Sequence, residues 1–267
     1  MHITNIISQV FGKFAKKEFP SFIQSIINNG YVKFLGLNMS EFRQAKYYKS
    51  LNDLFTRELA INREINVQED VFISPADSFI TQAGSLKGDI ALQIKGMEYS
   101  LEELLTFHAS TNISKMRDGK YMNFYLSPKD YHRYHASMSC TVKKLIHVPG
   151  KLYPVNIPYL KKELGLFVQN ERVILECYTK ENKLFYMVFV GALNVGQMVF
   201  NFEPQVETNK DVKEIQVYEY KDLHIQKGEC LGYFKMGSTV LMFWEKDLVD
   251  IVDLLDQNVS FSQAITK

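Results

Sequence analysis

Residues 184–202 read LFYMVFVGALNVGQMVFNF and contain no charged side chain. An uncharged stretch of this length is long enough for a membrane-spanning helix, for which about 20 residues suffice. However, glycines and amides interrupt the apolar run, at Gly191, Asn194, Gly196, Gln197 and Asn201. The aromatic and β-branched side chains around them are typical of strands. The stretch therefore predicts two strands joined through residues 191–196, and not a transmembrane helix.

The chain on either side of this stretch has the same character from about residue 60 onward. Short runs rich in valine, isoleucine, tyrosine and phenylalanine alternate with segments that contain glycine, proline and asparagine, as at residues 121–126, 173–178 and 215–220. Such runs are typical of strands separated by turns. We therefore predict a β-rich domain over residues 61–267.

The first 60 residues have a helical pattern instead. Apolar side chains recur at three- and four-residue spacing over residues 3–15, and again from Phe22 to Ile27. Asn29 and Gly30 predict the end of that second helix, and a third helix is expected over residues 40–60. The predicted fold class is α+β, with N-terminal amphipathic helices (residues 1–60) followed by a predominantly antiparallel β body.

Composition narrows the choice of function classes. The chain has 267 residues, with 31 Lys and Arg against 30 Asp and Glu, so its net charge gives no indication of a nucleic-acid partner. Cys140, Cys177 and Cys230 form no CxxC pair, which suits a reducing compartment. The lysines that follow the first apolar stretch do not fit a cleavable signal, so the protein is expected in the cytoplasm.

The amphipathic N-terminus has two interpretations. Its apolar side chains can pack on the β body, as such faces usually do. Alternatively, they can lie in a membrane interface, with aromatic rings in lipid and lysines at anionic headgroups. The candidates for this second role are Phe11, Phe14, Phe19 and Phe22, with Lys13, Lys16, Lys17 and Lys33. The pattern alone does not choose between the two.

Four separated segments carry residues of chemical interest: FTREL (residues 55–59), SPAD (74–77), YLSPKDYHRYH (125–135) and GST (237–239). Each has an ordinary structural explanation when taken alone. Together they supply a carboxylate at Asp77, imidazoles at His132 and His135, and a hydroxyl at Ser238. These groups can activate a weak nucleophile, because a carboxylate orients a histidine and the histidine removes the proton of a serine.

The same residues fit two other kinds of site less well. Zinc takes three or four ligands, and no third histidine, cysteine pair or acidic cluster lies near His132 and His135 at ligand spacing. A hydrolase of the α/β type places its serine in a GxSxG turn, whereas Val240 stands where the second glycine is required. No metal site is therefore expected, and hydrolysis of an external ester is the weaker hypothesis.

These segments resemble the phosphatidylserine decarboxylases of the bacterial and mitochondrial type. The resemblance rests on FTREL, SPAD, YLSPKDYHRYH with the VPG that follows at residues 148–150, and KGECLGYFKMGSTV at residues 227–240. The motifs keep the family's order from about Asp53 to Trp244. Ser78 stands where the family commonly has glycine, and Met236 where it commonly has leucine. Serine matters there only if the position needs positive φ, whereas methionine conserves volume.

The resemblance implies a self-processing proenzyme. It assigns Asp77, His135 and Ser238 to a triad that cuts the chain between Gly237 and Ser238. The products are a β chain of residues 1–237 and an α chain of residues 238–267. Ser238 becomes a covalent pyruvoyl group, the cofactor that decarboxylates phosphatidylserine to phosphatidylethanolamine in phospholipid biosynthesis. His132 is the implied general acid of turnover.

The implied substrate also bears on partners and location. A lipid headgroup lies at a bilayer surface, which favours interfacial N-terminal helices and a peripheral enzyme on the cytoplasmic face of the cell membrane. Arg57 and Arg133 are candidates to meet the lipid phosphate or to pair with acids. A homodimer of processed pairs is implied by the resemblance alone. The alternatives are an inactive lipid-binding protein that never cleaves, and a pyruvoyl enzyme acting on a soluble amino acid.

Overall fold

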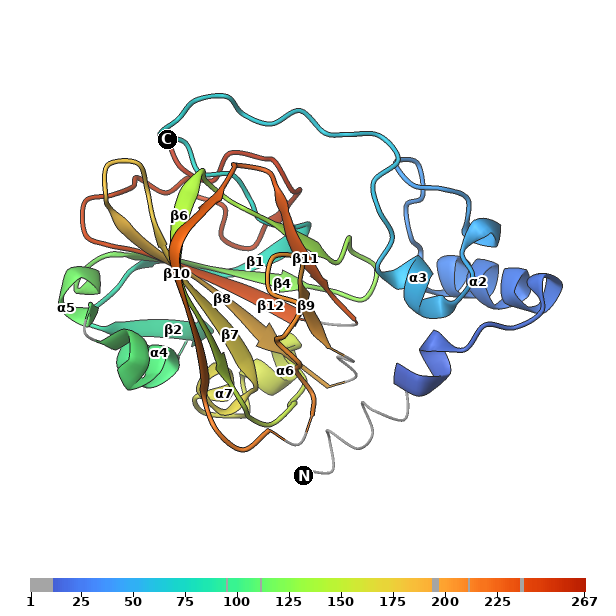
Figure 1. The fold of residues 1–267 in the computed structure, drawn as a ribbon, viewed down its shortest axis with the longest axis horizontal. Coiled ribbons are helices and arrows are strands. Elements are labelled where there is room, and N and C mark those ends of the chain that lie inside the picture. The colour runs from blue at the N-terminus through green and yellow to red at the C-terminus, as the bar shows by residue number, and fades with distance from the viewer. Residues whose placement is uncertain (1–11, 95, 111, 194–196, 211, 236–237) are drawn as a thin grey trace.

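The computed structural model describes residues 12–94, 96–110, 112–193, 197–210, 212–235 and 238–267. A large β body occupies one side of the molecule, and the N-terminal helices lie beside it (Figure 1). The predicted α+β class is therefore confirmed. Within the described residues, no helix is both long and apolar enough to cross a lipid bilayer.

The β body is built on an eight-stranded antiparallel sheet. Its order is β10 (Gln216–Ile225), β6 (Cys140–Val148), β7 (Arg172–Tyr178), β8 (Leu184–Gly191), β12 (Ser238–Trp244), β4 (Lys120–Leu126), β1 (Ser78–Ser85) and β13 (Asn258–Val259). The strands predicted at residues 121–126, 173–178 and 215–220 are β4, β7 and the first part of β10. Figure 1 shows the strands of the large sheet running through the centre of the body.

Two smaller sheets and several short helices complete the body. A three-stranded sheet holds β5 (Arg133–His135), β11 (Cys230–Phe234) and β9 (Met198–Phe200), and a hairpin holds β2 (Ile90–Ile94) and β3 (Met97–Ser100). The helices are α4 (Leu101–Ser110), α5 (Ile113–Met116), α6 (Ile157–Leu160) and α7 (Leu166–Gln169). Residues 184–202 form β8 and β9, so the prediction of two strands is confirmed. Asn194 and Gly196 lie outside the described residues.

Strand β12 lies in the middle of the large sheet, and all seven of its residues are buried. Val240, Met242 and Trp244 face a core that includes side chains of β5, β9 and β11. Leu241 and Phe243 face the opposite core, which includes side chains of α4 and α7. This alternation follows from the two-residue period of a strand. The strand is therefore covered on both faces and bonded along both edges.

The N-terminal region differs from its prediction in two places. Helix α2 (Ser21–Leu35) continues past Gly30, which is exposed within the helix, and ends at Gly36 with a φ of 65°. Glycine suits that left-handed position because it has no Cβ. Gly12 to Lys16 are also helical, whereas the rest of the helix predicted over residues 3–15 lies outside the described residues.

The third predicted helix, residues 40–60, is wrong as a continuous element. The segment contains only a 3-10 turn, η1 (Ala45–Tyr47), and a short helix, α3 (Leu51–Phe55). Ser50 begins α3 by accepting a hydrogen bond from the Asp53 amide at 3.1 Å. Phe42 and Leu59 form an antiparallel bridge, so the chain doubles back within the segment. Long-range pairing therefore overrides the local helical pattern.

Candidate active site

Asp77 lies where the chain enters β1. Its carboxylate accepts two hydrogen bonds from Arg63, at 2.5 and 3.0 Å, and one from the Phe261 amide at 2.7 Å. Arg63 also bonds Glu41 through two nitrogens, at 2.9 and 2.8 Å. Asp77 is thus fixed by a charged pair and by the C-terminal segment. Ser78, the family's usual glycine position, is the first residue of β1 and pairs with Val259 in extended backbone, so serine is unstrained there.

His135 lies at the end of β5 and is buried. Its Nδ1 is 2.9 Å from the Gly228 carbonyl oxygen, and its Nε2 is 3.0 Å from the Tyr131 hydroxyl. A carbonyl can only accept, so Nδ1 carries the proton and Nε2 accepts from Tyr131. The ring stacks on Phe261, with centroids 3.7 Å apart and planes 17° apart. Burial lowers the pKa of His135 to about 4, so the imidazole is neutral at pH 7.

His132 is completely buried at the entrance to β5. Its Nδ1 donates to the Asp130 carbonyl at 2.8 Å, and its ring lies against Phe55 with centroids 3.9 Å apart. Its Nε2 is buried without a hydrogen-bond partner in the described part of the chain. Burial lowers the pKa of His132 to about 3. The residue is therefore a neutral imidazole with an open Nε2 lone pair.

Ser238 begins β12 and is also completely buried. It is paired with Leu126 of β4 and Gly191 of β8. Its Oγ has no hydrogen-bond partner among the described residues. A buried hydroxyl without a partner is destabilising, and such groups are rare in folded proteins. Gly237, the other side of the predicted cleavage site, lies outside the described residues.

The structure brings the predicted residues together in two groups. Asp77 and His135 share Phe261, whose amide bonds the first and whose ring stacks on the second. Among the described residues, no hydrogen bond joins Asp77 to His135 or His135 to Ser238. His132 is bonded to the end of β11 that precedes Ser238, because its carbonyl accepts from the amide of Phe234, the last residue of that strand, at 3.0 Å. His135 pairs with Cys230 at the opposite end of that strand.

The two arginines proposed for phosphate or acid contacts have different surroundings. Arg133 forms an ion pair with Glu58 at 2.9 Å. Arg57 is buried and donates to backbone carbonyls. The sequence analysis did not single out Arg63 or Phe261, which contact Asp77 from 14 and 184 residues away. Neither lies in a recognisable motif, so only the folded structure reveals them.

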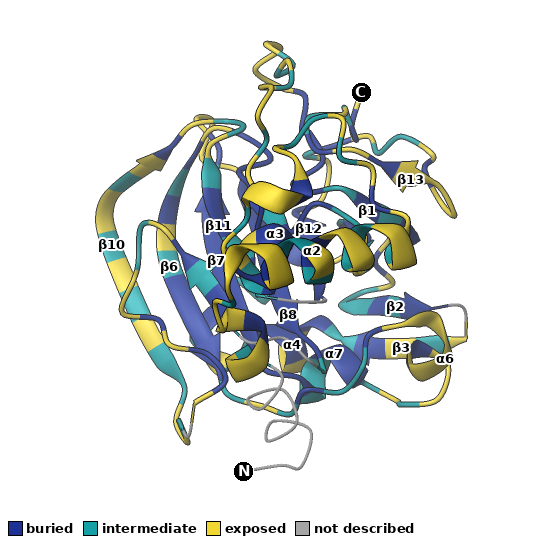
Figure 2. Cartoon of the chain, turned by 90° about the vertical axis from the view of Figure 1, so that its right-hand side faces the viewer, coloured by how far each residue is buried: buried dark blue, intermediate teal, exposed yellow. Residues whose placement is uncertain are grey.

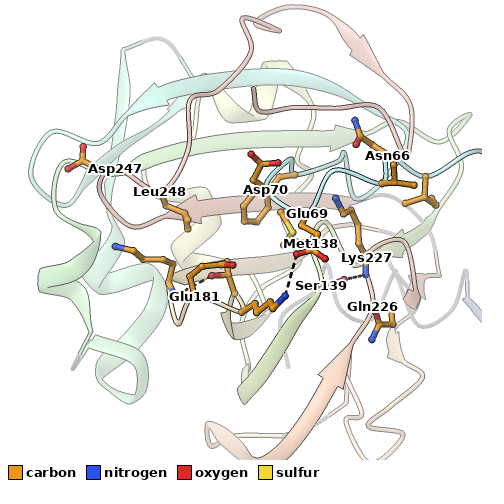
Figure 3. A pocket seen from close by; sticks show the side chains of 16 residues that line it. Asn66, Glu69, Asp70, Met138, Ser139, Glu181, Gln226, Lys227, Asp247 and Leu248 are labelled. Carbon is orange, nitrogen blue, oxygen red and sulfur yellow. Dashed lines mark hydrogen bonds and ion pairs between the residues drawn. The ribbon is translucent and has the colours of Figure 1, made fainter.

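Two neighbouring cavities, which share Ile65 in their linings, lie near this part of the body. One, of about 430 Å³, is lined by residues that include Arg63, Tyr131, Arg133, His135 and Cys230. A larger one, of about 680 Å³, is shown in Figure 3 with Asp70, Glu181, Lys227 and Asp247 among its lining residues. Asp77, His132, His135 and Ser238 are not among the residues that line the larger cavity. The smaller cavity therefore gives His135 its access to solvent.

The buried histidines predict a loss of stability in acid. The unfolded chain protonates His135 near its ordinary pKa of 6.5, whereas the folded protein resists protonation down to about pH 4. Stability is therefore complete above about pH 6.5 and falls as the pH decreases toward 4, by roughly 3 kcal/mol for this residue. Urea unfolding of the Ser238→Ala protein at several pH values measures the effect.

Two variants show whether His135 causes this loss. His135→Gln removes the titrating group, and we expect a smaller fall in stability between pH 6.5 and 4. His224→Gln is the control. The His224 side chain is 61% exposed, so it stays largely hydrated when the chain folds. An unchanged pH dependence in His135→Gln would contradict the assignment.

Comparisons with known proteins agree with the arrangement of motifs. The family model described as phosphatidylserine decarboxylase matches residues 51–267. A phosphatidylserine decarboxylase proenzyme of Helicobacter pylori is 43% identical over 264 residues, covering 98% of this chain and 97% of that relative. The Campylobacter jejuni proenzyme is 41% identical and covers 97% of each chain. The Shewanella amazonensis proenzyme is 35% identical, covering 92% of this chain and 87% of the relative.

The motif residues and these relatives show the class of protein: the chain is a decarboxylase that is made as a proenzyme. It belongs to the phosphatidylserine decarboxylase family.

Proposed function

We propose that this protein cuts its own chain between Gly237 and Ser238, converts Ser238 to a pyruvoyl group, and uses that group to decarboxylate phosphatidylserine to phosphatidylethanolamine in phospholipid biosynthesis. The observation that carries the proposal is the buried Ser238 Oγ without a hydrogen-bond partner, at the first residue of a central strand. Ser78, Thr81 and Thr239 also bury hydroxyls without a described partner, so this state alone does not assign a chemical role. Ser238 differs because it follows Gly237 in the GST segment, at the predicted cleavage site.

The cleavage proceeds in steps that conserve atoms. A base takes the Ser238 hydroxyl proton, and Oγ bonds to the Gly237 carbonyl carbon while the peptide C–N bond breaks, giving an ester and a free amine. Loss of the Ser238 α-proton breaks the Cβ–Oγ bond and releases the Gly237 carboxylate. The resulting dehydroalanine becomes an imine, and water replaces its nitrogen, which leaves as ammonia. The new residue 238 is the pyruvoyl group.

The fold explains how the short α chain stays in place after cleavage. Strand β12 follows the cut directly and lies between β8 and β4, with both of its edges bonded. Residues further along the α chain bond the β chain as well, since Ile265 donates to Phe72 and Ser74 donates to Gln263. The two products therefore share one hydrophobic core and separate only on unfolding.

The site suits a pyruvoyl group because position 238 is fully buried, and because His132, whose carbonyl bonds Phe234 at the end of β11, has an open nitrogen. When formed, the pyruvoyl carbonyl supplies an electron sink for decarboxylation. The chain's own residues hold and move protons. We assign the Ser238 proton to His135 oriented by Asp77, and the proton delivered to the substrate α-carbon to His132. To act as the base, His135 must exchange the hydrogen bond between its Nε2 and the Tyr131 hydroxyl for one with Ser238 Oγ. To orient His135, Asp77 must give up part of its contact with Arg63.

We propose residues 1–60 as a membrane-associating region that places the enzyme peripherally on the cytoplasmic face of the membrane. Helix α2 supports this, because its fully buried side chains are polar and several of its large apolar side chains are exposed. Its buried residues are the polar Gln24 and Asn28, and the Asn28 amide donates to the Ala45 and Tyr48 carbonyls. Three of its large apolar side chains point outward, since Phe22, Ile26 and Phe34 are 70%, 63% and 87% exposed, whereas Tyr31 and Val32 pack on a small N-terminal core.

The outward face has the composition of a lipid-binding surface. Figure 2 shows the exposed side of α2 on the outer face of the molecule. Lys13, Lys16, Lys17 and Lys33 are exposed in the same N-terminal region. Aromatic side chains with neighbouring lysines favour the interface of an anionic bilayer. An enzyme for a lipid headgroup gains substrate access from such contact.

Replacing the outward apolar residues tests the membrane proposal. Phe22→Ser, Ile26→Ser and Phe34→Ser combined should reduce binding to anionic vesicles by at least about tenfold, because each buried side chain contributes roughly 1.5–3 kcal/mol. Vesicle sedimentation measures this. Val67→Ser is the control, since Val67 is 91% exposed but lies outside the helical region.

Charge reversal at Lys13, Lys16 and Lys17 provides a second test of membrane binding, in which the effect should depend on salt concentration. It should weaken vesicle binding at low ionic strength and have less effect at high salt, where surface attraction is screened. Self-cleavage should be intact in every variant, because among the described residues no hydrogen bond or ring contact joins the replaced side chains to His132, His135 or Ser238. Unchanged sedimentation in both sets of variants would contradict membrane binding by α2 and would mean that the helix has only a structural role.

Intact mass of the purified protein tests the whole proposal. We expect two chains, residues 1–237 and 238–267, with the second carrying a pyruvoyl N-terminus in place of serine. Its carbonyl should react with a hydrazine. We also propose a homodimer of processed pairs, which the native mass reports. A single chain of 31.0 kDa would favour an inactive lipid-binding protein, and activity on free amino acids without lipid would favour a soluble substrate.

A further inference from the structure

Arg57, the arginine of the FTREL segment, is a buried cation whose described contacts include no carboxylate partner. It is 2% exposed. Its Nη2 donates to the carbonyls of Lys129 and Asp130, at 3.0 and 3.2 Å, and its guanidinium lies 4.5 Å from the centre of the Phe42 ring. Burying a charge without an opposite charge is costly. A neutral side chain would be buried there at a lower free-energy cost. We therefore expect the arginine to have a role in the active site.

The Asp130 carbonyl connects Arg57 to His132. The same oxygen accepts from Arg57 Nη2 at 3.2 Å and from His132 Nδ1 at 2.8 Å. The Asp130 carboxylate is turned away, toward the Ser127 amide and hydroxyl, at 2.7 and 2.8 Å. The carboxylate therefore fixes the turn, and the carbonyl is left for the arginine and the histidine to share.

The FTREL segment holds His132 from a second side. Phe55, two residues before Arg57, places its ring against the imidazole, with centroids 3.9 Å apart and planes at 44°. One short segment thus supplies both the ring that packs on His132 and the cation that fixes its hydrogen-bond acceptor. After the larger effect of burial, the positive charge of Arg57 also lowers the pKa of His132. A protonated imidazole is disfavoured beside it.

We propose that Arg57 is a positioning residue, which fixes the Asp130 carbonyl so that His132 keeps its proton on Nδ1 and presents an unprotonated Nε2 for proton transfer at position 238. The link to catalysis rests on the proposed function, because it requires His132 to act at that position. The effect of Arg57 on the tautomer of His132 is independent of the proposed function. No hydrogen bond joins Arg57 to Ser238 among the described residues.

Nitrogen NMR of ¹⁵N-histidine-labelled protein tests the tautomer directly. The background is the uncleavable Ser238→Ala precursor, so that the readout needs no activity, and a His132→Ala spectrum assigns the signals. We expect one neutral His132 species with a proton on Nδ1 and none on Nε2. In Arg57→Met, Asp130 loses its second donor, so the signals should show a mixture of tautomers or exchange broadening. Identical His132 signals with and without Arg57 would overturn the proposal.

Arg172→Met is the matched control for removal of a buried guanidinium. Arg172 is 3% exposed and donates to the carbonyls of Leu104, Val168, Asn170 and Glu103. Its loss should lower the melting temperature and leave the His132 signals unchanged. If Arg57→Met does not fold, Arg57→Lys serves instead, because it keeps the charge but cannot span two carbonyls. An unshifted His132 in Arg57→Lys would then count against the proposal.

Kinetics of the mature enzyme separate positioning from general damage. Arg57→Lys should lower kcat for decarboxylation by up to about 100-fold, the scale of a misplaced catalytic group, and leave KM unchanged because the Arg57 guanidinium is engaged by backbone carbonyls. In a His132→Ala background the same change should cause no further loss. An equal loss in both backgrounds would contradict positioning. Full activity of His132→Ala would remove the proposed role of His132, while the NMR result would still decide the effect of Arg57 on its tautomer.

Discussion

Ser238→Ala should yield a full-length chain of 31.0 kDa with no decarboxylase activity. Without the hydroxyl, no oxygen can attack the Gly237 carbonyl, and no precursor of the pyruvoyl group exists. The loss should be complete, since the same atom is needed for cleavage and for the cofactor. This is the largest effect that we expect from any single substitution. Gel electrophoresis and intact mass measure cleavage, and an ethanolamine-lipid assay measures activity.

The structure also predicts that this variant folds normally. Ser238 Oγ is buried without a described partner, so its removal leaves no other polar group unsatisfied and relieves the desolvation of the hydroxyl. The melting temperature should be equal to or above that of the uncut wild-type chain. Thr81→Val is the matched control: Thr81 in β1 also buries a hydroxyl without a described partner, and its loss should leave cleavage unchanged. Normal fragments from Ser238→Ala would exclude the mechanism.

The fold could be predicted from the sequence where local pattern and long-range structure agree. The valine- and phenylalanine-rich runs became strands of one antiparallel sheet, because buried strands need apolar side chains on both faces. The pattern was misleading in the N-terminal region. There, apolar residues at helical spacing indicated a face packed on the body, among other possibilities, whereas α2 is held by Asn28, which donates to the Ala45 and Tyr48 carbonyls, and by Tyr31 and Val32. Periodicity identifies the two faces of a helix but not which one is buried.

The candidate site could be predicted only as a set of residue types. Asp77, His132, His135 and Ser238 stood out because they lie in motifs, and the comparisons place those motifs in the phosphatidylserine decarboxylase family. Their partners could not be predicted, because Arg63, Phe261 and Gly228 reach them through long-range contacts of single side chains or carbonyls. The hydrogen-bond state of each imidazole depends on those partners, so sequence alone could not distinguish the two histidines physically.

The second large effect concerns these histidines, which lie three positions apart and are assigned to different steps. His132→Ala should still yield the two chains, with a pyruvoyl carbonyl that reacts with a hydrazine. Its decarboxylation should fall by about 10²- to 10⁴-fold, the range typical of a lost proton-transfer group. His135→Ala should fail earlier, at cleavage, because the base assigned to Ser238 is gone. Asp77→Asn should slow the same step, since it removes the charge that orients that base.

The structure explains why this experiment decides the assignment. The Nε2 of His135 is engaged by the Tyr131 hydroxyl at 3.0 Å, whereas the Nε2 of His132 is open, and His132 lies at the end of β11 that leads to Ser238. If His135 is the base, Tyr131→Phe should still cleave, because that change removes a competitor for the lone pair. If His132→Ala is uncut and His135→Ala is cut, the open nitrogen is the base and the two roles must be exchanged. Full processing and activity in both variants would mean that neither histidine moves a proton in this enzyme.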